Sequence, residues 1–124
     1  MNYVELQNQI IIDFKINHQP ISKCWGRTHC HPKERMVCKH SIKESYQSLF
    51  TLLHEIGHAE THKNSMKRCE TESIATLWAI EQMRKLGLPI RRKVMKQYKA
   101  YIKMSYDRGI RRGLSKRIKT SLYM

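Results

Sequence analysis

The sequence lacks the features of membrane-spanning and secreted proteins. None of its uninterrupted apolar runs approaches the roughly 20 residues that a transmembrane helix needs, so a transmembrane protein is excluded. No basic residue precedes the short apolar stretch at residues 10–12, unlike in a secretory signal, and we expect a cytoplasmic protein. Cytosolic reductants oppose stable disulfides, so we expect the cysteines to be reduced thiols. They are Cys24, Cys30, Cys38 and Cys69.

Proline is scarce, and no internal repeat or low-complexity linker interrupts the chain. The three prolines are scattered and mark no Pro/Gly-rich boundary. A chain of 124 residues and 14.8 kDa has room for one compact core. We therefore predict a single domain over residues 1–124, in which residues 91–124 form a basic C-terminal extension.

Acidic side chains are few, especially near the C-terminus. Lys and Arg number 24 against 10 Asp and Glu, and the formal net charge is +14. Residues 91–124 alone hold 12 basic side chains and one acid. Such a charge favours polyanions, so nucleic acid is a candidate partner for residues 91–119 through phosphate contacts. The alternative is a solvated face, and no base-reading motif indicates sequence-specific recognition.

Hydrophobic periodicity predicts three helices. Ser41 and Glu44 have the spacing of a capping box at the start of the first, and apolar residues then recur at helical intervals. The second is expected to stop at Gly87, which can adopt a left-handed conformation, and Pro89 blocks any extension. The predicted helices cover residues 42–62, 71–86 and 91–106.

The N-terminal part is expected to supply a small sheet. The pattern at residues 4–16 fits either a buried strand or part of a helix, and we expect a helical turn or coil followed by a strand at residues 10–16. Residues 35–39 fit another strand. Turn signals around Gly26 and Pro32 separate the two segments. The predicted fold class is therefore α+β, with a sheet of two or three strands packed on helices.

The first predicted helix contains the sequence His54-Glu55-Ile56-Gly57-His58. A spacing of four residues puts both imidazoles on one helix face, where they can bind the same zinc ion. Glu55 lies about 100° further round the helix, so it is poorly placed as a ligand but can approach a water at the metal. The motif predicts hydrolysis by water, with Glu55 as the general base.

A catalytic zinc needs a third protein ligand, and three residues are candidates. His62 continues the histidine face, but imidazoles spread over about 12 Å of helix axis cannot converge on one ion. Glu72 shares its helix face with small residues such as Ala75 and Ala79, which would allow a close approach of two helices. Glu70 fits better as a first-turn acid stabilised by the helix dipole. The geometry favours Glu72 and leaves Glu70 as the alternative.

Two segments together resemble a known family. Residues 50–58, Phe-Thr-Leu-Leu-His-Glu-Ile-Gly-His, resemble the zinc-binding helix of ImmA/IrrE-type metallopeptidases. The later pattern Glu72-x-x-Ala75-x-x-x-Ala79 is similar to the helix that carries their third ligand. The resemblance covers residues 41–86, about a third of the chain.

This resemblance implies a minimal gluzincin-like (zincin) fold and a Zn²⁺-dependent endopeptidase acting on a protein substrate. Members of the family are linked to cleavage of DNA-bound repressors. The implied metal ligands are His54, His58 and Glu72, with Glu55 as the base. The sequence departs from the family in the short interval between the second histidine and the glutamate, and in Thr76, where the family usually has asparagine.

A second resemblance and a second function stay open. Residues 24–59 are also similar to SprT-like metalloproteases, but those enzymes take a third histidine as ligand, and none follows His62 here. The alternative function is a basic nucleic-acid-binding or inhibitory protein with a structural or vestigial zinc site. For an oxyanion-stabilising residue, the candidates are His62, Tyr98 and Tyr101.

Metal-capable side chains also concentrate between residues 24 and 40. No C-x-x-C pair is present among them, so loop and strand residues without a metal role are the alternative to a second, structural zinc. The candidates are Cys24, His29, Cys30, His31, Cys38 and His40.

Overall fold

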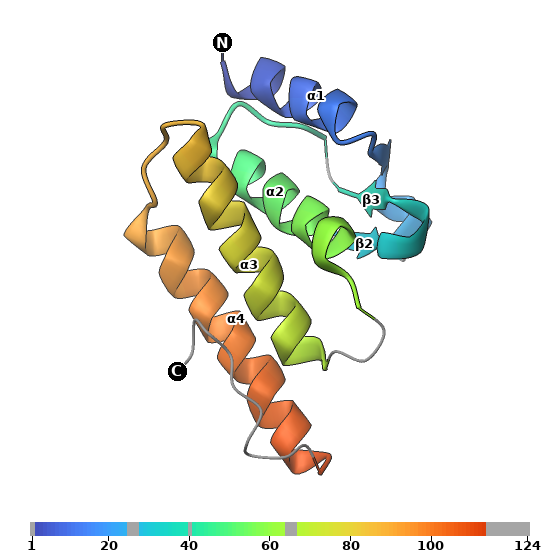
Figure 1. Ribbon diagram of the computed structural model, residues 1–124, viewed down its shortest axis with the longest axis vertical. Coiled ribbons are helices and arrows are strands. Elements are labelled where there is room, and N and C mark those ends of the chain that lie inside the picture. Colours follow the sequence, from blue (N-terminus) through green and yellow to red (C-terminus); the bar gives the residue numbers. More distant parts are fainter. Residues whose placement is uncertain (1, 25–27, 40, 64–66, 114–124) are drawn as a thin grey trace. The chain divides into compact units, whose positions relative to one another are not determined.

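The computed structural model describes residues 2–24, 28–39, 41–63 and 67–113 (Figure 1). It has four α-helices and a small mixed sheet, so the α+β prediction is confirmed for these residues. The chain divides into two compact units, Met1–Glu60 and Thr61–Met124. The prediction of a single domain stays a prediction. The basic residues Lys116, Arg117 and Lys119 lie outside the described residues.

The first unit begins with helix α1, Tyr3–Asp13. The Asn2 side chain accepts a hydrogen bond from the Glu5 N–H at 2.8 Å and caps the helix. The strand predicted at residues 10–16 is therefore wrong, because residues 10–13 are helical and β1 begins only at Asn17. Gln7 and Ile10 are buried three residues apart, so the apolar run belongs to one helix face rather than to an alternating strand.

Three short strands form the sheet, with β3 in its centre. β3 pairs in parallel with β1 and antiparallel with β2. The predicted strand at residues 35–39 and the predicted small sheet are confirmed. Arg35 has a left-handed backbone between the last short helix and β3, with φ of 50°. The elements are β1 Asn17–Gln19, η1 Ile21–Cys24, β2 His29–His31, η2 Pro32–Glu34 and β3 Met36–Cys38.

Helix α2, Tyr46–Thr61, begins four residues later than predicted. The capping box is wrong for this helix, because Ser45 supplies the hydroxyl that accepts the Ser48 N–H at 3.1 Å. The Glu44 carboxylate instead accepts the backbone N–H groups of Tyr3 and Val4 at the start of α1. The capping-box pattern assigned Glu44 to α2, but in the structure this side chain binds the start of α1.

A buried polar network lies beneath the start of α2. Lys39 follows β3 and is only 6% exposed, and its Nζ donates to the Ser48 hydroxyl at 3.0 Å. That oxygen also accepts the Lys43 N–H at 3.1 Å, and the hydroxyl donates to Gln7 Oε1 at 2.8 Å. Burial, and then the charge of Lys43, lower the pKa of Lys39. Ser48 therefore connects α1, α2 and the segment after β3.

Replacing Ser48 by alanine should lower the free energy of unfolding by about 3 kcal/mol. The change removes three hydrogen bonds and leaves a buried lysine without this acceptor. Chemical denaturation measures the effect. Ser41→Ala is the matched control: Ser41 is exposed, so it should change stability by no more than about 0.5 kcal/mol. Equal losses in the two variants would contradict the network.

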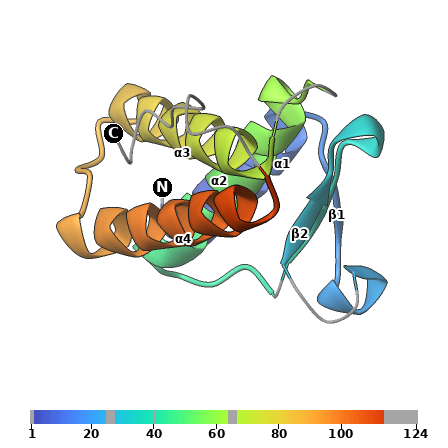
Figure 2. The same ribbon diagram turned by 90° about the horizontal axis from the view of Figure 1, so that it is seen from below.

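The second unit is built on helices α3, Arg68–Lys85, and α4, Arg92–Arg111, which lie side by side (Figure 2). Both helices were predicted, and α4 continues past the expected end. Gly87 has a φ of 72°, so the predicted left-handed stop after α3 is confirmed. The Arg68 guanidinium donates to the Tyr101 hydroxyl at 3.0 Å, which joins the two helices.

The cysteines do not all match the expectation of reduced thiols. Cys30 and Cys69 are free and buried, whereas Cys38 is disulfide-bonded, so the prediction is wrong for Cys38. An argument from cellular compartment takes no account of which sulfur atoms the fold brings together. The side chain of Cys24 lies outside the described part of the chain. No helix in the described residues is long and apolar enough to cross a membrane. The cytoplasmic location stays a prediction.

Candidate metal centre

The two histidines of the motif lie on adjacent turns of α2. Their ring centroids are 4.8 Å apart, with an interplanar angle of 87°. His54 is 3% exposed and His58 is half-buried. Helical spacing puts both imidazoles on one side, and the helix is anchored by fully buried apolar residues. These anchoring residues are Leu49, Phe50, Leu52 and Ile56.

Glu72 lies in the second turn of α3 and is 7% exposed. The same helix face carries Ala75 and Ala79, both fully buried, as the sequence pattern indicated. The Thr76 hydroxyl donates a hydrogen bond to the backbone carbonyl of Glu72 at 2.8 Å. This hydrogen bond does not orient the Glu72 carboxylate. Glu70 has another role, because its carboxylate accepts the Lys67 N–H at 3.0 Å at the start of the helix.

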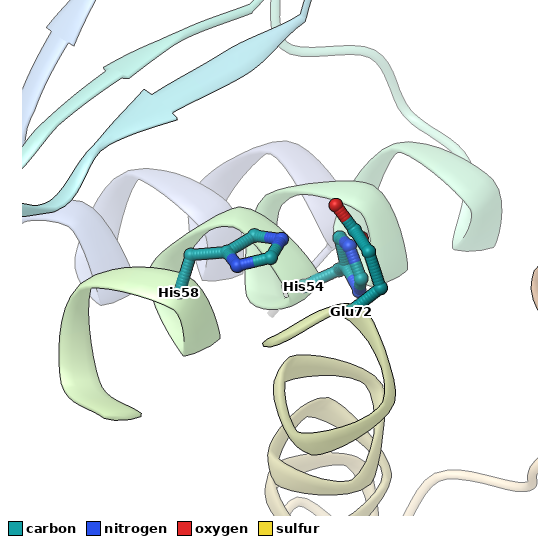
Figure 3. Close-up of side chains that lie close together, drawn as sticks. All are labelled: His54, His58 and Glu72. Atoms are coloured by element: carbon teal, nitrogen blue, oxygen red, sulfur yellow. The ribbon is translucent and has the colours of Figure 1, made fainter. Parts of the chain in front are cut away.

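His54, His58 and Glu72 form a group that could hold a metal ion (Figure 3). Each residue offers one ligand atom, and these atoms all lie within 4.8 Å of one another. Tetrahedral zinc with ligands near 2.1 Å needs donor atoms about 3.4 Å apart, a difference that side-chain rotation can close. Two imidazoles and a carboxylate are also a donor set that zinc accepts. The residues fit the predicted ion, and Glu70 does not belong to the group.

The charge of Glu55 acts on two groups of the first unit. Glu55 is half-buried, and the two groups are Cys30 of β2 and Lys39 after β3. Burial, reinforced by Glu55, raises the pKa of the Cys30 thiol to about 12, so this thiol is neutral near pH 7. The lysine brings a positive charge near Glu55. No local pattern indicated Lys39, because its burial depends on strand pairing.

The remaining candidates lie outside this group. His62 is exposed and follows the last residue of α2, so it does not extend the histidine face. Cys38 cannot serve as a thiolate ligand while it is in a disulfide. Within the described ranges, the metal-capable residues at 24–40 form no further group of three potential ligands. His40 lies outside those ranges.

The chain was compared with protein-family models, curated proteins and solved structures. None of the three comparisons gave a match. The resemblance to ImmA/IrrE-type metallopeptidases is thus neither supported nor opposed by them, and it stays a prediction.

Proposed function

We propose that the protein is a zinc-dependent metallopeptidase with a zincin-like fold that hydrolyses peptide bonds of a protein substrate. The observation that carries the proposal is the group of ligand atoms from His54, His58 and Glu72 within 4.8 Å of one another. The adjacent Glu55 adds a carboxylate next to two potential ligands without belonging to the group itself. Two potential ligands and the proposed base thus come from one short stretch of α2, and the third potential ligand comes from α3.

The number of ligands favours a catalytic rather than a structural ion. Structural zinc sites are closed by four protein ligands, whereas catalytic sites use three and leave one position open. Among the described residues, the group has three members. This count supports the enzyme over the alternative of a structural zinc site.

The chemistry follows from the donor set and from Glu55. When bound, zinc would supply Lewis-acid polarisation of a peptide carbonyl and of a water molecule. His54, His58 and Glu72 would hold the ion. Glu55 takes one proton from the attacking water and delivers it to the departing amine, while the water oxygen forms a bond to the carbonyl carbon and the C–N bond breaks. No covalent enzyme intermediate is required.

The proposal is tested by measuring the zinc content of the purified protein and its peptide cleavage with and without a chelator. The purified chain should bind one zinc ion and cleave peptides from a digested cell lysate, with new termini mapped by mass spectrometry. Removal of the metal by a chelator should abolish cleavage, and added zinc should restore it, because the open coordination position supplies the chemistry. Cleavage that persists in the chelator, or a chain that binds no zinc, would contradict the proposal.

A further inference from the structure

Helix α4 carries a straight row of cations on its solvent side. Arg92, Lys96, Lys99 and Lys103 follow one another at intervals of four, three and four residues, and all four are exposed. At 100° per residue they fall within an arc of about 60°, and they extend over about 16 Å of helix axis. We call these four residues the cationic stripe.

The cationic stripe lies opposite the face that packs within the unit. Val94, Ile102 and Ser105 are the buried residues of α4, and this helix packs against α3. Around the axis of α4, the mean direction of these buried side chains is more than 120° from the mean direction of the stripe. The stripe therefore contributes nothing to this packing and is presented outward.

Within α4 the positive charge is barely offset. Asp107 is the one acid in the helix, and its carboxylate pairs with Lys103 Nζ at 2.9 Å. Like charges three and four residues apart repel each other, by roughly 0.2–0.5 kcal/mol for each pair. A polyanion aligned with the stripe would remove this repulsion and release counterions.

We propose that the cationic stripe of α4 binds the phosphate backbone of double-stranded DNA without sequence preference. A membrane-surface helix needs an apolar face to insert, but the apolar face of α4 is packed, and Met104 is its one exposed large apolar residue. Long cationic side chains contact phosphate oxygens, which carry no sequence information, and α4 contains no base-reading motif. Duplex DNA offers a dense and regular row of negative charge, one per about 1.7 Å of axis.

The test compares two triple variants with equal loss of charge. One carries Arg92→Gln, Lys96→Gln and Lys99→Gln. The control carries Lys23→Gln, Lys33→Gln and Lys63→Gln, three exposed positions that do not belong to α4. Fluorescence anisotropy with a labelled random-sequence DNA duplex is measured over a salt series, and circular dichroism and thermal unfolding check that both variants fold.

The stripe variant should bind DNA about tenfold more weakly at low salt, and its salt slope should be shallower by about 2 to 3. The control should keep most of the affinity and slope of the parent chain. Equal weakening in both variants would overturn the proposal, since net charge alone would then explain binding. Stronger binding to duplex RNA, to phosphatidylserine vesicles or to polyglutamate than to DNA would overturn it as well. None of these outcomes depends on zinc or peptidase activity.

Discussion

Replacing Glu55 by glutamine should reduce peptide hydrolysis by about 10²–10⁴-fold while the protein still binds one zinc ion. The amide has nearly the shape of the carboxylate but cannot accept the proton of the attacking water. Glu55 is outside the group of potential ligands, so metal binding should be preserved. Cleavage rates and zinc content, measured on the same preparation, separate the two effects.

The matched control for this variant is Glu81→Gln. Glu81 is exposed on α3 and forms a solvated ion pair with Lys85 at 3.6 Å, so its loss should leave both the cleavage rate and the zinc content unchanged. If Glu55→Gln cleaves as fast as the parent chain, Glu55 is not the base. If the variant loses zinc, its carboxylate is part of the metal site and the assigned roles are wrong.

Replacing Glu72 by glutamine should weaken zinc binding by more than about 100-fold. Loss of a partner that only orients a ligand costs about 10- to 100-fold in metal affinity, and loss of the ligand itself should cost more. An amide oxygen carries no formal charge to offset the ion. Competition against a zinc-chelating dye measures the affinity, and cleavage should fall in parallel.

Glu70→Gln is the control for Glu72→Gln because it tests the rival ligand with the same chemical change. It weakens the acceptor for the Lys67 N–H, which should cost up to about 1 kcal/mol in stability but leave zinc affinity unchanged. The reverse pattern, with zinc lost in Glu70→Gln and kept in Glu72→Gln, would contradict the proposed ligand set. If both variants bind zinc as tightly as the parent chain, neither glutamate is a ligand, and the proposed ligand set is contradicted as well.

The sequence determined the features that depend on neighbouring residues. The four-residue interval between His54 and His58 fixes two imidazoles on one helix face wherever α2 lies. Gly87 ends α3 as its spacing predicts, and the charge of residues 91–124 is visible by counting. These features follow from helical periodicity and local backbone conformation, which a short stretch of sequence specifies.

Local patterns failed where a residue found its partner far along the chain. Glu44 fits a cap for the next helix, yet it binds backbone N–H groups about 40 residues earlier. The run at residues 10–12 suits strand or helix, and burial of one face decided for the helix. In both cases the local pattern allows two alternatives, and a contact far along the chain decides between them.

The residues of the candidate site also fall into those that the sequence indicates and those that only the tertiary structure brings together. Sequence alone determined His54, Glu55 and His58, because all three follow from one turn and a quarter of helix. The tertiary structure places Glu72, and not Glu70, among the potential ligands, and it brings Lys39 close enough for the charge of Glu55 to act on its pKa. Periodicity fixes the direction of a side chain around its own helix axis, but only packing fixes which atoms of another element it meets.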